Sequence, residues 1–133
     1  MIPEAQKQQM AEAVAKIRET MAAAAKAAGR DPAEVRLCAA CKTRTVEEVR
    51  YSADLPIDLF GENHVQELCA NFDAGAYCGK PSHFIGHLQT NKIKKVLGRA
   101  SLIQSVDSEH LLNAIEKEAA KAGIVQDVLL RLF

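Results

Sequence analysis

Residues 35–43 read VRLCAACKT, an apolar run that ends in a lysine and a threonine. A short apolar run bounded by turn residues is typical of a strand buried in a parallel sheet. Lys42 therefore lies at the end of the first predicted strand. In a desolvated cleft, loss of hydration would lower the pKa of such an amine and free its lone pair to condense with an aldehyde. The alternative is a solvated lysine beside the strand, since most lysines lie on the surface.

Similar apolar runs recur along the chain and alternate with helical patterns. Strands are predicted at residues 57–63, 83–87, 102–106 and 125–133, and connecting helices at residues 45–53, 64–72, 91–97 and 109–122. A long amphipathic helix over residues 4–28 precedes them, and Thr45 and Ser108 are candidate helix caps. This alternation favours right-handed βαβ units and an α/β fold with a parallel sheet.

Polar side chains follow or close several of the predicted strands. They are Lys42, Asn63, His87 and Ser105. The carboxyl ends of parallel strands meet at one rim of a sheet, where α/β proteins build their ligand sites. We therefore expect these four side chains to gather at one binding site. Taken singly, each has a simpler explanation, such as a histidine satisfied by nearby backbone.

Composition limits the classes of partner. The 133 residues, 48% of them hydrophobic, are enough for one domain with a core. Seventeen basic and seventeen acidic residues balance, so no broad positive surface for nucleic acid or anionic membrane is expected. Lys92, Lys94 and Lys95 are more typical of a solvated helix face than of a phosphate or RNA site. No run has the length of a membrane span, and the first residues lack a signal-peptide pattern.

The four cysteines, Cys38, Cys41, Cys69 and Cys78, are irregularly spaced. Two lie in the first predicted strand, where free cysteine behaves as a small hydrophobic residue, which favours a reducing, cytoplasmic setting. The C-x-x-C spacing of Cys38 and Cys41 could indicate metal or redox chemistry. Residues three apart on a strand point to opposite faces, however, so no metal site is expected.

Four motifs together carry a family resemblance. They are AACKT at residues 39–43, FGENHVQE at 60–67, HFIGHLQTNK at 83–92 and SVDS at 105–108. In this order and at these intervals they closely resemble the pyridoxal phosphate homeostasis proteins of the YggS/PROSC type. The resemblance implies a TIM-barrel-type fold of parallel (βα) units, similar to the amino-terminal domain of alanine racemase. It covers only the first half or somewhat more of the family's usual length. We therefore expect a single domain over residues 1–133, an incomplete barrel of about five strands.

The resemblance also implies a cofactor. Lys42 matches the lysine that holds pyridoxal 5′-phosphate (PLP) as a Schiff base, and Asn63, His87 and Ser105 match positions at the cofactor-bearing rim. The family's members are similar to cofactor carriers, not enzymes, so no catalytic residue is expected. This sequence departs from the family pattern at Cys41, at His64 and at Ser82, where serine, tyrosine and tryptophan respectively are common.

Strands beyond the fifth would normally supply phosphate-binding backbone amides. Without them we expect weaker cofactor binding, and open sheet edges that pair with a second copy or with a complementing chain. Two other functions stay open. One is an amino-acid racemase, which needs a base opposite Lys42, and the other is an interaction module whose ligand site has lapsed.

Overall fold

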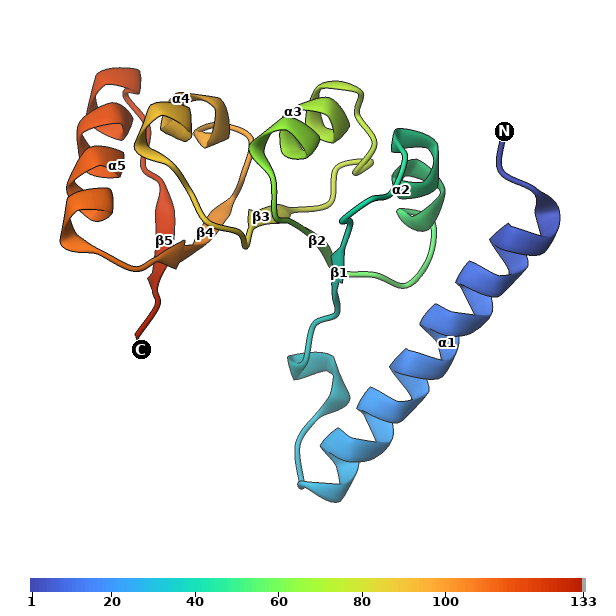
Figure 1. Ribbon diagram of the computed structural model, residues 1–133. Helices are drawn as coiled ribbons and strands as arrows, with labels where there is room; N and C mark the ends of the chain where they lie inside the picture. Colours follow the sequence, from blue (N-terminus) through green and yellow to red (C-terminus); the bar gives the residue numbers. More distant parts are fainter. Residues whose placement is uncertain (133) are drawn as a thin grey trace.

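Five parallel strands lie side by side in sequence order in the computed structural model, which describes residues 1–132 (Figure 1). They are β1 (Cys38–Ala40), β2 (Leu59–Glu62), β3 (Ser82–Phe84), β4 (Leu102–Val106) and β5 (Asp127–Leu130). Each strand pairs in parallel with the next one along the chain. The prediction of an α/β fold built from consecutive βα units is therefore confirmed.

Helices connect the strands and lie on one face of the sheet (Figure 1). They are α2 (Val46–Ser52), α3 (Val65–Asp73), α4 (Ile93–Val96) and α5 (Glu109–Ala122), with the short 3-10 turn η2 (Thr90–Lys92) directly before α4. A second 3-10 turn, η1 (Pro32–Glu34), precedes β1 and is not part of this layer. The core lies between this helix layer and the sheet. Its largest fully buried apolar side chains include Phe60, Leu68, Phe84, Ile93 and Ile103.

Two helix starts are determined locally, as predicted. The Thr45 side chain accepts the backbone N–H of Glu48, and the Glu48 carboxylate accepts the N–H of Thr45, which forms a complete capping box for α2. Ser108 accepts the N–H of Leu111 at the start of α5. Such caps satisfy backbone donors that have no partner inside the helix, so these boundaries are visible in the sequence.

The strands are shorter than predicted. The first covers Cys38–Ala40 instead of residues 35–43, because the Asp58 carboxylate takes the N–H of Leu37 (2.6 Å) and Thr43 turns the chain at its other end. Cys38 is also exposed and not part of the core. In the fifth predicted strand, residues 125–133, only Asp127–Leu130 is extended, and Phe133 lies outside the described residues.

Two later elements, a strand and a helix, are also shorter than predicted. The third strand is Ser82–Phe84 and stops before the predicted end at His87. The helix predicted at residues 91–97 is split into η2 and the single turn α4. Both segments lie next to the carboxyl ends of the strands. There the chain leaves regular structure earlier than its apolar pattern indicates, since after the bond from the Ile85 N–H to the Glu62 carbonyl (2.9 Å) Gly86 turns against the Asn63 backbone.

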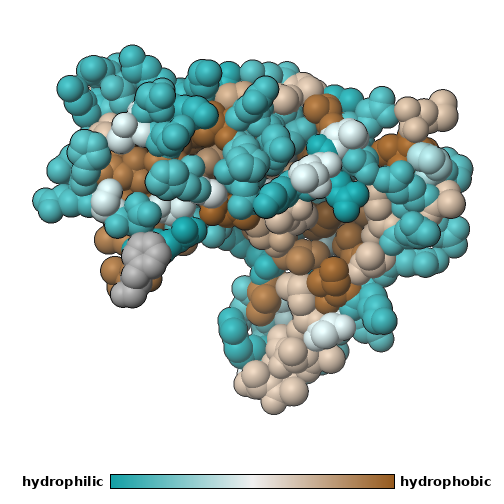
Figure 2. Space-filling view, in the orientation of Figure 1, coloured by the Kyte–Doolittle hydropathy of each residue, from teal (hydrophilic) through white to brown (hydrophobic). Residues whose placement is uncertain are grey.

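The long helix α1 (Glu4–Ala27) lies beyond β1, and its first turns contact α2, where the Tyr51 hydroxyl donates to the Lys7 carbonyl (3.1 Å) (Figure 1). Arg18 ties it to the sheet by an ion pair with Asp58 (2.6 Å) and a hydrogen bond to the Pro56 carbonyl (2.7 Å). Figure 2 shows hydrophobic residues gathered in the hollow between the sheet and α1, with hydrophilic residues over most of the helix layer. Within residues 1–132, no helix combines the length and apolar character that a membrane crossing requires.

Candidate functional site

Lys42 is the first residue beyond the hydrogen-bonded part of β1. The N–H of Cys41 still donates to the Gly61 carbonyl of β2 (3.0 Å), and the N–H of Arg44 then turns back to the Cys41 carbonyl (3.0 Å). Thr43 adopts φ 65°, which is strained for a β-branched residue. Strain of this kind persists only where the surroundings hold it, and it is concentrated at ligand sites. The strand therefore ends abruptly before Lys42.

Asn63 and His87 follow the next two strands and are brought together by a glycine. The N–H of Ile85 donates to the carbonyl of Glu62 (2.9 Å), and Gly86 then passes against the Asn63 backbone. A Cβ built on Gly86 would lie 2.1 Å from the Asn63 carbonyl oxygen. Only glycine permits this approach, so Gly86 determines how closely the ends of β2 and β3 meet.

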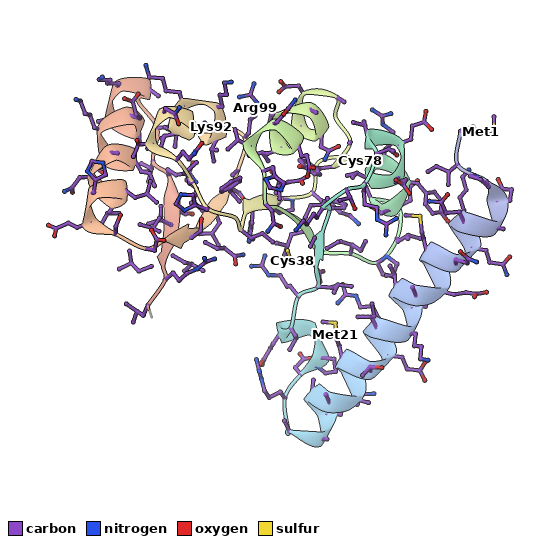
Figure 3. The ribbon with its side chains drawn as sticks, in the orientation of Figure 1. Met1, Met21, Cys38, Cys78, Lys92 and Arg99 are labelled. Atoms are coloured by element: carbon purple, nitrogen blue, oxygen red, sulfur yellow. The ribbon has the colours of Figure 1, made fainter. Side chains whose placement is uncertain are left out.

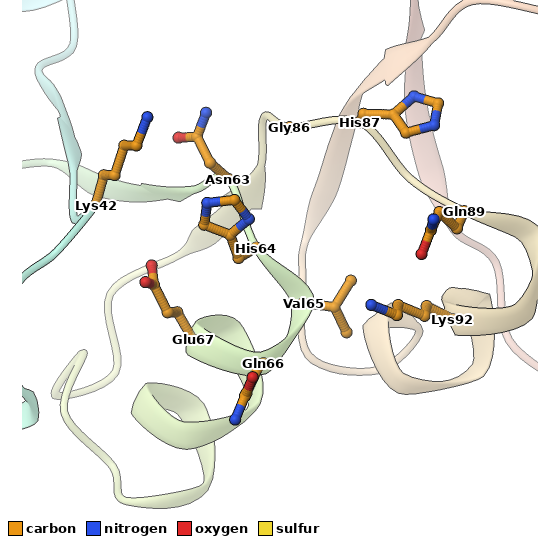
Figure 4. A pocket seen from close by; sticks show the side chains of 10 residues that line it. All are labelled: Lys42, Asn63, His64, Val65, Gln66, Glu67, Gly86, His87, Gln89 and Lys92. Carbon is orange, nitrogen blue, oxygen red and sulfur yellow. The ribbon is translucent and has the colours of Figure 1, made fainter.

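A cavity of about 620 Å³ opens where these three strand ends meet (Figure 4). We call it the rim cavity. It is lined by Lys42, Asn63, His64, Val65, Gln66, Glu67, Gly86, His87, Gln89 and Lys92. Its volume is typical of small-ligand sites. Two ammonium groups against one carboxylate favour a ligand that carries negative charge.

The structure brings three of the four predicted residues together. Lys42, Asn63 and His87 line the rim cavity, and Figure 4 shows Lys42 and Asn63 extending side by side. Ser105 does not line it. Its side chain is buried, with 2% exposed, and its Oγ has no hydrogen-bond partner within residues 1–132. The reason is that β4 runs to Val106, so Ser105 lies inside the strand and not after its end.

The predicted desolvation of Lys42 is not found, because its side chain is exposed. Within the described sheet β1 is an edge strand whose single neighbour is β2. Side chains after β1 are therefore screened from water on one side only. Asn63, which follows the more central strand β2, is half-buried. Lys42 thus lies among the other rim residues, but its side chain is exposed to solvent.

Several residues of the rim cavity were missed in the sequence. They are His64, Gln66, Glu67 and Gln89, and Lys92, which was predicted to lie on a solvated helix face, also lines the cavity. Three of them lie at the start of α3, which begins at Val65, two residues after Asn63, so that its first turn stays at the rim. The immediate succession of strand, polar residue and helix in the motif FGENHVQE was the signal that could have identified them.

A buried carboxyl group, that of Glu62, lies at the end of β2, directly before Asn63. Glu62 is fully buried, and its Oε2 accepts hydrogen bonds from the Asn71 amide (2.7 Å) and the Tyr77 hydroxyl (2.5 Å). Its Oε1 has no partner within the described residues. Burial raises the pKa of Glu62, and the two hydrogen bonds offset this only in part. Burial and the nearby Glu62 carboxyl in turn raise the pKa of the Cys41 thiol. The residues before Lys42 and before Asn63 thus share one desolvated cluster.

A parallel sheet of consecutive βα units in sequence order, here open and five-stranded, is the arrangement of a TIM-barrel-type α/β protein, and the cavity at the carboxyl ends of its strands is a candidate small-molecule site. No protein-family model matches the chain. The pyridoxal phosphate homeostasis protein of Aquifex aeolicus is 37% identical over 121 residues, which are 91% of this chain and 53% of that protein. The protein of the same name from Pseudomonas aeruginosa is 38% identical over 98 residues, 74% of this chain and 43% of its own length.

Solved structures agree with these relatives. An unknown protein from Bifidobacterium adolescentis superimposes with a TM-score of 0.89 at 35% identity, over 97% of this chain and 56% of that one. PipY of Synechococcus elongatus PCC7942, solved with PLP bound, gives 0.73 at 28% identity, over 90% of this chain and 52% of PipY. The chain belongs to the family of pyridoxal phosphate homeostasis proteins, and it spans about half the length of the curated relatives that it matches.

Proposed function

We propose that this chain binds PLP as part of intracellular vitamin B6 homeostasis, with the cofactor held as a Schiff base on Lys42. The observation that carries the proposal is the convergence of Lys42, Asn63 and His87 on one cavity from three successive strands. The names of the relatives and the PLP bound to PipY support it. The chain acts as a carrier and not as an enzyme, in a reducing cytoplasm where its four cysteines stay free.

The residues present fit this cofactor. PLP offers an aldehyde, and the exposed amine of Lys42 can condense with it by losing water. The Asn63 amide and the His87 imidazole can form hydrogen bonds with the substituents of the PLP ring. The Lys92 ammonium group can attract the PLP phosphate. Ser105 does not line the rim cavity, and it stays in the proposed set only because its buried hydroxyl has no partner within residues 1–132. The close approach of Gly86 to the Asn63 backbone keeps the ends of β2 and β3, which carry Asn63 and His87, next to each other.

The affinity of this chain for PLP is expected to be lower than that of its longer relatives. In barrels of this type the phosphate is commonly bound by backbone amides after strands seven and eight, whereas the described sheet has five strands. A charge-assisted hydrogen bond contributes about 1.5–3 kcal/mol. The loss of two would weaken binding by about two to four powers of ten.

Replacement of Lys42 by alanine is expected to abolish the covalent cofactor adduct. With PLP added in excess, the unmodified chain should develop the absorbance band of a PLP–lysine Schiff base, and the Lys42→Ala chain should show only free cofactor. Borohydride reduction followed by peptide mass spectrometry should then locate the modification on Lys42.

Lys94→Ala is the matched control, because Lys94 is an exposed lysine that does not line the rim cavity. It should leave the adduct unchanged. An equal band in the Lys42→Ala and unmodified chains, or a reduced adduct spread over surface lysines, would remove Lys42 as the anchor and with it this function.

The edges of the sheet are proposed to pair with another chain. Within the described residues β1 and β5 each have one neighbour, and β5 carries the apolar side chains Leu129 and Leu130, which are 51% and 63% exposed. An exposed apolar edge strand presents free backbone donors and acceptors to a second strand. The occupant is either a second copy or a complementing polypeptide.

Sedimentation velocity is expected to show the purified chain as a species heavier than one copy. Leu129→Lys places a charge on the β5 edge and should shift the equilibrium toward the monomer, because a buried unpaired ammonium opposes strand pairing. Lys117→Gln, on the exposed side of α5, should have no effect. A well-folded monomer at all concentrations, with no mass change in the variant, contradicts self-pairing through this edge.

A further inference from the structure

A second cavity lies next to the rim cavity, between α3 and α4. Its volume is about 430 Å³, and it is lined by Val65, Gln66, Cys69, Lys92, Lys95 and Arg99. We call it the α3–α4 pocket. One wall is a face of α3, and the other consists of cationic residues from η2, α4 and the turn that follows. Figure 3 places Lys92 and Arg99 in this region. Half of the lining residues are basic, and none is acidic.

The surrounding sequence concentrates positive charge in a chain whose formal net charge is zero. Residues 74–106 contain no Asp or Glu, yet they include Lys80, Lys92, Lys94, Lys95 and Arg99. Most of the acidic residues that balance this block lie elsewhere in the chain, and exposed charges interact only over about 8–10 Å at physiological salt. Within the described residues, Asp73 and Glu118 pair with Arg99 and Lys94 of the block. The pocket is therefore a local positive site.

The cations of the pocket differ in their availability. The Arg99 guanidinium is held by Asp73 through two hydrogen bonds (2.9 and 3.1 Å) and donates to the Lys95 carbonyl (2.7 Å). Asp73 thus partly neutralises Arg99 and fixes it in place. Within residues 1–132, neither Lys92 nor Lys95 has a carboxylate within 4.0 Å, whereas Lys94, on the same turn, lies 3.9 Å from Glu118. Two unpaired ammonium groups therefore face one cavity.

Two unpaired ammonium groups repel each other. A dianion bound between them would attract both and so offset that repulsion. A phosphate monoester is the matching ligand because it carries close to two negative charges and several acceptor oxygens, and lysine is a common phosphate ligand. The Gln66 amide is a neutral donor in the same wall. The pocket therefore has the charge and the donors that this group requires.

The two cavities adjoin each other, because Val65, Gln66 and Lys92 line both. We propose that the α3–α4 pocket is a non-covalent subsite for a phosphate monoester, bound by Lys92 and Lys95 without participation of the Lys42 amine. That this monoester is PLP rests on the function proposed above. In this subsite the phosphate would be bound by lysines of the helix layer, and not by backbone amides at the ends of strands.

Pyridoxine 5′-phosphate separates this subsite from the Schiff base. It carries the phosphate ester of PLP but an alcohol in place of the aldehyde, so it cannot condense with a lysine. Titration calorimetry of the full chain at low ionic strength should show binding that inorganic phosphate displaces, and pyridoxine without phosphate should bind more weakly. Lys95→Gln should weaken binding of pyridoxine 5′-phosphate by about 5- to 30-fold, the loss of one ion pair with a dianion near the surface.

Lys94→Gln is the matched control, since it removes the same charge from the same helical turn outside the pocket. It should change the affinity by no more than about twofold. Equal losses in the two variants, or equal binding of pyridoxine and its phosphate, would overturn the subsite. A missing Lys42 adduct with intact phosphate-dependent binding would remove the Schiff base and keep the pocket, and the reverse result would remove the pocket alone.

Discussion

Substitution of Gly86 by alanine is expected to lower the free energy of unfolding by about 3 kcal/mol, at the upper end of the usual cost of overpacking. The added Cβ would lie 2.1 Å from the carbonyl oxygen of Asn63 and 2.7 Å from two further backbone atoms of that residue. A backbone cannot move aside as the end of a side chain can, so the ends of β2 and β3 must separate. Urea denaturation measures the loss. The PLP adduct should weaken in parallel, because Asn63 and His87 would move apart.

Gly61→Ala is the appropriate comparison. Gly61 lies in β2, and its added Cβ would meet the Ile85 Cδ1 at 2.9 Å and the Cys38 Sγ at 3.0 Å. Both are ends of side chains that can shift, so about 1 kcal/mol is expected. Equal losses of stability in the two variants would show that the contact between Gly86 and Asn63 is not what holds the rim.

Replacement of Glu62 by alanine is expected to cost about 3 kcal/mol or more, since it leaves the Asn71 and Tyr77 donors buried without an acceptor and opens a void. Glu62→Gln keeps the size and one acceptor oxygen, so its effect should be small at low pH and should change sign as pH rises. The pKa of Glu62 in the folded chain is raised above its ordinary value of 4.5, so the folded state binds the proton more tightly than the unfolded state.

The stability that Glu62 contributes is therefore complete below pH 4.5 and is lost as the pH rises through the raised folded value. Glutamine does not titrate, so the Glu62→Gln chain should gain stability relative to the unmodified chain across that interval. Chemical denaturation at a series of pH values from acid to neutral measures this difference. Glu116→Gln, on the exposed surface of α5, should follow the unmodified profile. Parallel profiles for Glu62→Gln and the unmodified chain would refute the buried, proton-holding role.

Some residues of the candidate site could be predicted from the local sequence pattern, and others could not. Lys42 and Asn63 were identified because each follows or closes a predicted apolar strand, and in a parallel sheet such positions share a rim. Ser105 satisfied the same pattern but lies inside β4, because the strand pairs for longer than the pattern indicated. Glu62 drew no attention, since its partners Asn71 and Tyr77 come from other elements.

The order of strands and helices, the capped starts of α2 and α5 and the position of Lys42 at a strand end were all determined by the sequence alone. These features depend on periodicity and on contacts between residues a few positions apart. The tertiary structure alone decided that Lys42 is exposed, that Ser105 is buried away from the cavity and that Glu62 is sealed behind it. The burial of a side chain depends on contacts with elements that are distant in the sequence. A residue at an edge strand has neighbours on one side only, so it stays more exposed.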